Sequence, residues 1–366
     1  MKVPFNDLYR IHRPDKNAFQ ALFNEVLVKS DFIGGNLVAT FEREWAEWLG
    51  VNNSAAVANG TDALYLALKA GDIGFGDEVI VPAMTWVSSI STIVQAGAKP
   101  VIVDIEEGYY TLDPNAIEEA ITDKTKAVIA VHLYGQACDM SKIMKLCENY
   151  GLMLIEDCAQ SHGTYYSGSH VGSLGDYGTF SHYPGKNLGA FGDAGTILAK
   201  KFEDLERVKK ISRHGGLVKH QHELFGINSR LDPLHAGVLS IKLKRLNDWN
   251  DERRRIAEIY SEELAACEDL KVPRVRNDTV HSYHVYSIEV LKNKEELKNH
   301  LVTNGIQVLN HYPRHLGQIP IYAPFAKHTM QNALCMTERN ISIPLFPGMM
   351  ESEINYVVES IKSFYK

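Results

Sequence analysis

The sequence predicts an α/β protein in which a mostly parallel sheet is sandwiched by helices and followed by a smaller C-terminal α/β domain. Short apolar runs alternate with helical stretches between residues 55 and 157, which is typical of parallel strands joined by helices. Polar or glycine-containing turns follow several of these runs, as expected where a strand leads into a helix. Beyond residue 200 long helical stretches dominate, and a strand-like run returns at 284–290.

The first half of the chain is expected to supply the large sheet. Apolar residues at helical spacing predict helices over 16–29 and 38–49, whose aromatic side chains suit the core. The strands expected after them are 55–58, 78–82, 100–104, 127–131 and 152–155. The helices expected between and after these strands are 62–70, 86–96, one opening at Asp113-Pro114, and 141–150. Ligands of such sheets bind at the carboxyl ends of the strands.

The second half is expected to be mainly helical. Helices are predicted at 203–213, at 233–266 with a break near 247–249, at 293–304 and at 351–364. The strand at 284–290 lies among them. We therefore expect a large domain over residues 1–250 and a small C-terminal domain over residues 251–366.

Composition narrows the class of protein. Of 366 residues, 45% are hydrophobic and 23% charged, which is enough apolar material for a large globular core. The net charge of −7, with both signs mixed along the chain, gives no sign of a nucleic-acid partner. No apolar run approaches membrane-spanning length, and the polar N-terminus lacks a signal-peptide core, so a cytoplasmic protein without a membrane partner is expected.

The five cysteines also favour a cytoplasmic protein. Their number is odd and no pair has CxxC spacing, which favours a reducing compartment over a disulfide framework or a structural zinc site. A catalytic metal is not expected either. Pro313 separates His311 from His315, so the two do not share a helical face, and His220 and His222 alternate in a polar stretch. The chain also has no Walker A motif and no GxGxxG.

The most informative stretch is residues 181–195, SHYPGKNLGAFGDAG. Lys186 lies between glycines, and the β-type residues 196–198 follow, which predicts a tight loop between two strands. A lysine amine attacks carbonyl carbons when its charged form is disfavoured. Taken alone, the stretch would suit a surface lysine in a glycine-rich turn equally well.

Three strand ends carry further polar or aromatic residues. The turn 59–62 (NGTD) opens a helix and could bind phosphate through free backbone amides, or could simply cap that helix. Asp157 could pair with a cationic ring nitrogen and Gln160 with an oxygen of the same ring, or both could belong to a capped helix start. Trp86 could lie flat on an aromatic ring, or pack in the core.

Together these features match one cofactor, pyridoxal 5'-phosphate (PLP, or PMP in its amine form). This cofactor needs a Schiff-base lysine, a carboxylate beside its pyridine nitrogen, a phosphate site and a stacking partner. The carboxylate keeps the ring nitrogen protonated, so the ring can accept electrons when the carbon next to the imine loses a proton. All four parts are present in this sequence.

Over nearly its whole length the chain resembles the DegT/DnrJ/StrS family of nucleotide-sugar aminotransferases. The matching stretches are DFIGG at 31–35, NGTDAL at 59–64, GDEVIVP at 76–82, HLYG at 132–135, EDCAQ at 156–160, the loop 181–195, GINSRLD at 226–232 and HYP at 311–313. Their order and spacing make the resemblance specific. It implies the aspartate-aminotransferase-like fold (PLP fold type I) and a homodimer with shared active sites.

The resemblance also implies roles for individual residues. Lys186 is expected to be the catalytic Schiff-base lysine. Asp157 is expected to pair with the pyridine nitrogen, Gln160 to contact the phenolic oxygen and Trp86 to stack on the ring. The residues expected to bind the phosphate are Gly60, Thr61, Ser181 and Asn228 of the partner subunit.

Residues 183–190 resemble the branch that aminates carbon 3 of dTDP-linked 3-keto-6-deoxyhexoses. The expected reaction takes an amino group from an amino acid, expected to be L-glutamate, to such a nucleotide-linked keto-sugar. The residues expected to face the sugar nucleotide are Tyr183, His311, Tyr312 and Lys219 of the partner subunit, whose charge suits a pyrophosphate.

Three departures from the family pattern leave local packing and fine substrate preference open. His182, Ala194 and His235 stand where phenylalanine, glycine and glutamine are usual. None removes a group that the chemistry needs. Three alternative functions remain: amination at carbon 4 of a sugar carrying another nucleotide, a sugar dehydratase of the same fold, and a non-catalytic regulatory homologue. Lys186 argues against the dehydratase, which carries histidine there, and the intact set of Lys186, Asp157 and Gln160 argues against the regulator.

Overall fold

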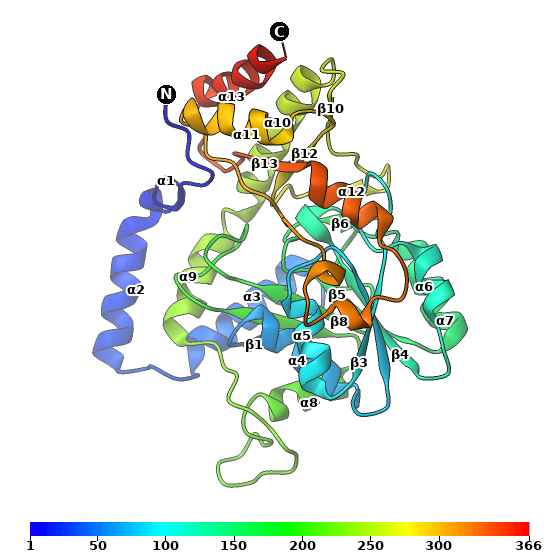
Figure 1. Cartoon of the computed structure of the whole chain (residues 1–366). Helices are drawn as coiled ribbons and strands as arrows, with labels where there is room; N and C mark the ends of the chain where they lie inside the picture. Colours follow the sequence, from blue (N-terminus) through cyan, green and yellow to red (C-terminus); the bar gives the residue numbers. More distant parts are fainter. Residues whose placement is uncertain (366) are drawn as a thin grey trace.

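The computed structural model describes residues 1–365, and its main feature is a seven-stranded sheet (Figure 1). The strand order is β1-β9-β8-β5-β4-β2-β3. The strands are β1 (Ala55–Val57), β2 (Glu78–Pro82), β3 (Lys99–Val103), β4 (Thr125–Val131), β5 (Met153–Asp157), β8 (Tyr177–Ser181) and β9 (Gly195–Ala199). The run from β3 to β8 is parallel, and β9 is antiparallel to both of its neighbours. The predicted mostly parallel sheet is confirmed.

Helices cover both faces of this sheet because the strands are apolar on both sides. Alternate residues point to opposite faces: Val79 and Val81 belong to one core cluster and Ile80 to another. The helices packed on the first face are α4 (Gly60–Ala70), α5 (Ser88–Ala96) and α8 (Phe202–Ile211). Those on the second face are α3 (Asn36–Leu49), α6 (Pro114–Ala120), α7 (Met140–Tyr150) and α9 (Pro233–Leu243).

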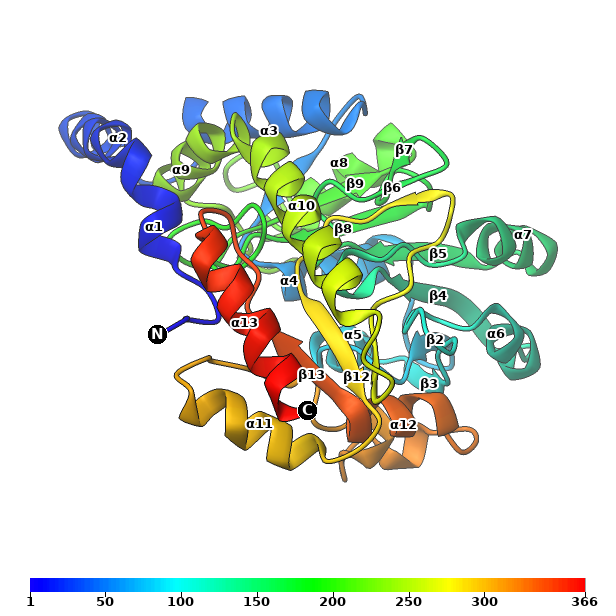
Figure 2. The ribbon, with the colours of Figure 1, turned by 90° about the horizontal axis from the view of Figure 1, so that it is seen from above.

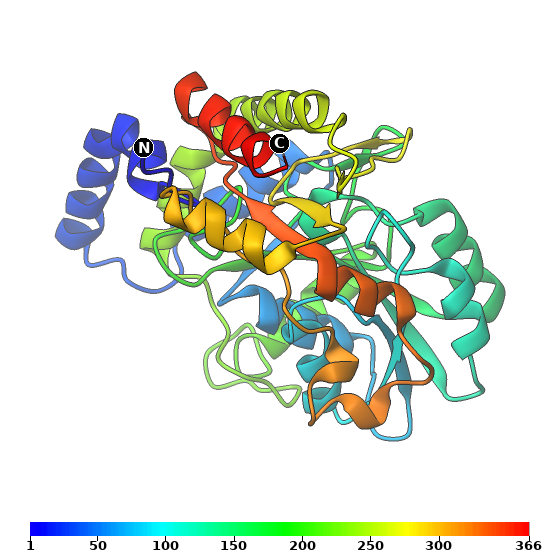
Figure 3. The same ribbon diagram turned by 45° about the horizontal axis from the view of Figure 1, so that its top comes forward.

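The C-terminal part has its own antiparallel sheet and its own core. Its strands, in the order β10-β12-β13, are β10 (Leu270–Lys271), β12 (Tyr286–Val290) and β13 (Asn340–Ile343). Its helices are α10 (Leu246–Leu264), α11 (Lys294–Thr303), α12 (Gln331–Arg339) and α13 (Glu351–Phe364). Figures 2 and 3 show α13 lying between α10 and α11. The proposed domain boundary between residues 250 and 251 falls inside α10.

The remaining elements are short or peripheral. They are α1 (Leu8–His12), α2 (Lys16–Lys29), and the small sheet of β11 (Thr279–Val280), β6 (Tyr165–Tyr166) and β7 (Ser169–His170). The helix expected over 233–266 is two helices, α9 and α10, which are separated at residues 244–245 and not near 247–249. The break lies upstream because Trp249 packs into the C-terminal core and stays helical. Within residues 1–365, every helix is too short or too polar to cross a bilayer.

Candidate active site

A cavity of about 840 Å³ opens where the carboxyl ends of the central strands meet the C-terminal part of the chain. The predicted site residues among those lining it are Gly60, Thr61, Trp86, Asp157, Gln160, Ser181, Tyr183, Lys186, His311 and Tyr312. These residues are spread over 253 positions of sequence, from 60 to 312, and the fold brings them to one place. Their position agrees with the general rule for parallel sheets.

Lys186 lies on the loop between β8 and β9. The backbone N–H of Lys186 donates to the Tyr183 carbonyl at 2.8 Å, which closes a tight turn. Gly189 is required there, because a Cβ atom at this position would lie 2.4 Å from the Pro184 oxygen. Burial lowers the pKa of the Lys186 amine to about 8, although the nearby Asp157 carboxylate favours the charged form. Loss of its proton near neutral pH makes Lys186 a nucleophile for carbonyl carbons.

Asp157 ends β5 and is buried. Its Oδ2 accepts a hydrogen bond from the Ser89 hydroxyl at 2.8 Å, and its Oδ1 accepts one from the Ala159 amide at 3.1 Å. Burial raises the pKa of Asp157, while these two donors and the Lys186 charge act in the opposite direction. The arrangement holds one carboxylate in a fixed orientation inside the cavity, where it can pair with a cationic ring nitrogen.

Gln160 is fixed from both ends of its side chain. Its Oε1 accepts from the Tyr134 backbone amide at 2.8 Å, and its Nε2 donates to the Tyr312 hydroxyl at 2.9 Å. Trp86 lies beside Tyr312, with ring centroids 5.7 Å apart. Because Trp86 is 57% exposed, the core-packing alternative for it is wrong, and its ring forms part of the cavity wall.

The turn at the start of α4 forms a second polar wall. The Asn59 side chain accepts from the Asp62 amide at 2.8 Å, so the capping interpretation holds for Asn59 itself. A Cβ atom on Gly60 would lie 2.6 Å from the Ser181 Cβ, so the backbone and Ser181 meet closely. The Thr61 hydroxyl lies 2.8 Å from that of Ser88. Helix-start amides with several hydroxyls are a general anion site.

We predict that Gly60→Ala weakens binding of the phosphorylated cofactor. The added methyl group would force Ser181 away from the start of α4, because 2.6 Å is shorter than any normal carbon contact. Dissociation of PLP, followed by its absorbance during dialysis, should be faster in this variant. Gly74→Ala is the matched control, because its Cβ would meet nothing closer than 3.7 Å. Equal PLP retention in the two variants would remove Gly60 from the phosphate site.

Tyr183 and His311 also line the cavity. Tyr183 is 58% exposed, as a residue that meets a large substrate should be. His311 Nδ1 lies 2.8 Å from the Ser342 hydroxyl. Burial and the Lys186 charge lower the pKa of His311 to about 4, so its ring is neutral near pH 7.

Asn228 and Lys219 are not among the residues lining this chain's cavity. Both lie in the segment between α8 and α9, which extends away from the body of the molecule (Figure 1). Asn228 forms a β-bridge with Arg213, and Phe225 in the same segment is fully exposed. An extended segment with an exposed aromatic side chain is suited to contact a second subunit, and the roles of both residues there remain proposals.

The fold explains the departure at His182. Its ring is buried and packs edge-to-face on Trp45, with centroids 5.4 Å apart, as a phenylalanine ring would. Burial lowers the pKa of His182 to about 4, so the ring is neutral. Its Nδ1 lies 3.0 Å from the Leu188 carbonyl and its Nε2 lies 3.0 Å from the Thr196 hydroxyl. A neutral ring that donates to Leu188 and accepts from Thr196 fastens the Lys186 loop to β9.

The other two departures lie beside the same loop. Ala194 is buried at its end. His235 contacts the loop from α9, since a Cβ on Gly192 would lie 2.9 Å from its ring. Both are packing positions in this fold and leave the polar groups of the cavity unchanged.

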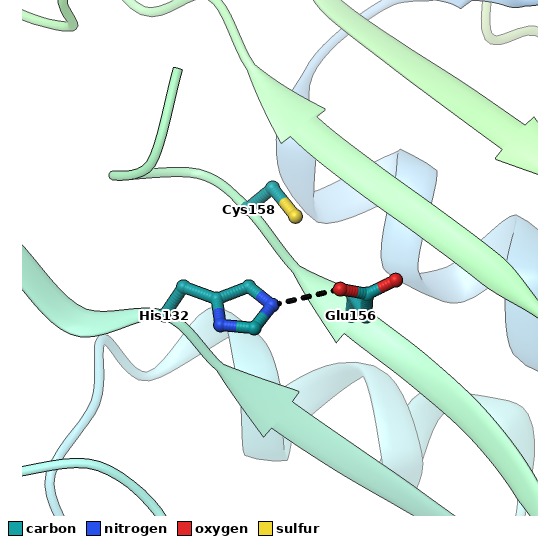
Figure 4. A group of neighbouring side chains, drawn as sticks. All are labelled: His132, Glu156 and Cys158. Atoms are coloured by element: carbon teal, nitrogen blue, oxygen red, sulfur yellow. Dashed lines mark hydrogen bonds and ion pairs between the residues drawn. The ribbon is translucent and has the colours of Figure 1, made fainter. Parts of the chain in front are cut away.

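One group of metal-ligating residue types occurs within residues 1–365, namely His132, Glu156 and Cys158 (Figure 4). His132 Nε2 lies 3.0 Å from Glu156 Oε2, and His132 Nδ1 accepts from the Cys138 amide at 3.1 Å. Glu156 also accepts from the backbone amides of Gly172, Leu174 and Gly175. These hydrogen bonds already use both ring nitrogens and both carboxylate oxygens, so the group fastens β4 to β5.

The donor set of the cavity fits PLP. The start of α4 offers amides and hydroxyls for a phosphate, Asp157 offers a carboxylate for a ring nitrogen, and Lys186 offers an amine for an aldehyde. Among the polar residues that sequence reasoning missed, Ser88, Arg253 and His284 line this cavity, and Ser89 lies behind Asp157. Ser89 holds Asp157.

A comparison with protein families matches the DegT/DnrJ/EryC1/StrS aminotransferase family over residues 14–362. Among curated relatives, the dTDP-3-amino-3,6-dideoxy-alpha-D-galactopyranose transaminase of Aneurinibacillus thermoaerophilus is 41% identical over 362 residues, 99% of each chain. A pleiotropic regulatory protein of Geobacillus stearothermophilus is 38% identical, covering 100% of this chain and 99% of its own. The UDP-N-acetyl-3-dehydro-alpha-D-glucosamine 3-aminotransferase of Acidithiobacillus ferrooxidans is 38% identical, covering 98% and 97%.

Solved structures agree with these matches. DesV of Streptomyces venezuelae superimposes with a TM-score of 0.97 at 35% identity, covering 100% of this chain and 99% of its own. NtdA of Bacillus subtilis, solved with bound PMP, superimposes with a TM-score of 0.92 at 29% identity, covering 99% and 85%.

Proposed function

The chain belongs to the DegT/DnrJ/EryC1/StrS aminotransferase family, and from this premise we propose that it transfers the amino group of L-glutamate to carbon 3 of a dTDP-linked 3-keto-6-deoxyhexose. It is a PLP-dependent nucleotide-sugar aminotransferase. The observation that carries the proposal is the cavity that places Lys186, Asp157 and the start of α4 together. Two of the relatives, named for a dTDP-sugar and a UDP-sugar, support carbon 3, because both names place the amino group there.

When bound, PLP withdraws electrons from the carbon atom that carries the amine. Each protein group has a separate task in our proposal. Lys186 would hold the aldehyde covalently at rest, and its released amine would move the proton from the amino-acid carbon to the cofactor carbon. Asp157 keeps the ring nitrogen protonated. The helix start at Gly60 and Thr61 anchors the phosphate, which fixes the reacting atoms relative to Lys186.

The substrate is tested by incubating the enzyme and L-glutamate with dTDP- and UDP-linked 3-keto and 4-keto sugars. NMR of the product gives the position of the new amine. We expect amination of the dTDP-linked 3-keto sugar at carbon 3. A preference for a 4-keto sugar would move the reaction to carbon 4, which is the second candidate. If L-glutamate leaves the cofactor absorbance of the holoenzyme unchanged, the chain would be a regulatory homologue. One of the relatives above is named as a regulatory protein.

We also propose that the active sites of a homodimer are shared, with Lys219 and Asn228 reaching the cavity of the opposite subunit. The exposed Phe225 on the extended segment supports such a contact. Two inactive variants test the proposal when they are co-expressed: Lys186→Ala, and the double variant Lys219→Glu/Asn228→Ala. Activity should return to about a quarter of the wild-type level, because half of the dimers are mixed and half of the sites in them are free of lesions.

Active sites that lie within single chains predict a different recovery of activity. If each site lies within one chain, every site in a mixed dimer keeps a lesion and no activity returns. Mass spectrometry of the intact dimers confirms that mixed dimers have formed. Absence of recovery in confirmed mixed dimers would place both residues at their own chain's site or at none.

A further inference from the structure

Arg253 is a buried cation beside Lys186 for which the proposed chemistry has so far assigned no role. It lies on α10, is 3% exposed and lines the main cavity. It also shares with Lys186 the wall of a small void of about 10 Å³. The next two residues differ from it, since Arg254 pairs with Asp251 and Arg255 pairs with Glu351 at the surface.

The hydrogen bonds of Arg253 use one side of its guanidinium group. Nη1 donates to the carbonyls of Tyr283 at 3.2 Å and Leu345 at 3.1 Å. Nε is buried and, within residues 1–365, has no hydrogen-bond partner. The edge formed by Nε and Nη2 is the one that binds a carboxylate through two parallel hydrogen bonds. The protein therefore supplies hydrogen-bond acceptors for Nη1, and the Nε–Nη2 edge remains available to bind a carboxylate.

Among the described residues, Arg253 also lacks an ion-pair partner, although the Glu252 carboxylate lies close enough to favour its charged form. No carboxylate within residues 1–365 forms an ion pair with it. Burial lowers the pKa of Arg253 to about 10, so the group remains charged near pH 7. A buried, unpaired charge costs folding free energy unless a ligand compensates it.

Asn187 and His284, two polar residues that share a cavity wall with Arg253, do not balance this charge. The Asn187 amide nitrogen donates to Asn250 Oδ1 at 2.9 Å and to the Ser282 carbonyl at 3.0 Å. The Asn187 oxygen must then accept from His284 Nδ1, which lies 3.1 Å away. Burial, together with the charges of Lys186 and Arg253, holds the pKa of His284 well below its usual value, so its ring is neutral. The residues that line the cavity include two cations, Lys186 and Arg253, and three carboxylates, of which only Asp157 is buried, while Asp62 is half-buried and Asp193 is exposed.

We propose that Arg253 binds the α-carboxylate of the amino-acid donor through its Nε–Nη2 edge. This inference rests on the proposed function, in which Lys186 moves a proton at the α-carbon of that donor. The α-carboxylate is attached to the same carbon. Arg253 and Lys242 both share the small void with Lys186, but of these two cations only Arg253 also lines the main cavity. The pair of Arg253 and the α-carboxylate would fix the amino acid relative to Lys186 and would favour α-amino acids over simple amines as donors.

The test uses the holoenzyme and the donor half-reaction alone. Loss of cofactor absorbance is followed against the concentration of L-glutamate in wild type, Arg253→Met and Arg253→Lys. Arg253→Met should raise the apparent Kd for L-glutamate by roughly 30-fold or more, as expected when one partner of a buried charge pair is removed. Arg253→Lys should recover part of the affinity. Arg255→Met is the matched control, because it removes the same charge from an exposed position of the same helix.

A second measurement separates binding from a structural role. 4-Aminobutyrate is L-glutamate without its α-carboxylate, so wild type should prefer L-glutamate strongly and Arg253→Met should lose that preference. Arg253→Met should weaken the reaction of the PLP form with the aminated sugar nucleotide much less than it weakens the reaction with L-glutamate. If Arg253→Met does not fold, Arg253→Lys is used in its place. Its preference for L-glutamate over 4-aminobutyrate, compared with that of wild type, then tests whether Arg253 binds the α-carboxylate.

Three results would overturn the proposal: an unchanged Kd for L-glutamate, equal weakening of both half-reactions, or an unchanged preference over 4-aminobutyrate in the Arg253 variants. The first removes Arg253 from the donor site, and the others reduce it to a structural contact between α10 and the carbonyls it binds. Failure of the proposed function looks different. Wild type would then react with L-glutamate but aminate none of the keto-sugars.

Discussion

Lys186→Ala is expected to abolish measurable turnover while leaving the fold intact. The amine is needed twice, once to hold the cofactor covalently and once to move the proton between two carbon atoms. The fold should tolerate the change because the loop is held by backbone hydrogen bonds, such as that from the Lys186 amide to the Tyr183 carbonyl, and not by the side-chain amine. Burial also disfavours the charged form of the Lys186 amine, as the lowered pKa of about 8 indicates, so removal of this amine should not destabilise the fold.

Three measurements check this expectation. Steady-state assays with L-glutamate and the keto-sugar give turnover, and thermal unfolding gives the stability of the variant. Borohydride reduction followed by mass spectrometry shows whether the cofactor is covalently attached, which requires the amine of Lys186. Lys200→Ala, an exposed lysine just after β9, is the control and should behave like wild type. Turnover by purified Lys186→Ala protein would refute the central role given to this residue.

Much of this site could be predicted because its parts lie at strand ends. Asp157 and Gly60 each follow a short apolar run, and the parallel-sheet rule places such ends on one edge. The Lys186 loop was recognisable from its glycines, and the structure shows the close backbone contact that requires Gly189. The resemblance to a known family then gave each residue a role that residue types alone left open.

Other parts depend on contacts that no local pattern encodes. Ser89 has the sequence context of an ordinary helix residue, and only the packing of α5 on the sheet brings its hydroxyl to Asp157. Arg253 stands in a run of three arginines that is typical of a solvated helix face. In the structure Arg253 is buried and donates to the carbonyls of Tyr283 and Leu345, while its two neighbours form ion pairs at the surface. The short strand β13 and the helix α12 before it were also missed.

Asp157→Asn is expected to lower kcat/KM by on the order of 10²-fold or more while retaining some cofactor, as is common when a charge-stabilising group is removed from an active site. The amide has the shape of the carboxylate, and its oxygen can still accept from Ser89, so the fold should be preserved. It cannot keep the cofactor ring nitrogen protonated, and the ring then accepts electrons poorly when Lys186 removes the proton.

The charge, and not the shape, of residue 157 is therefore what the experiment measures. Burial raises the pKa of Asp157, so the ionised form depends on its donors and on nearby positive charge. Single-turnover rates with L-glutamate, recorded with the cofactor absorbance, separate slow chemistry from lost cofactor. Asp123→Asn makes the same change at an exposed position and serves as the control. Wild-type rates in Asp157→Asn would mean that this side chain only positions the chain after β5 through Ala159 and Ser89.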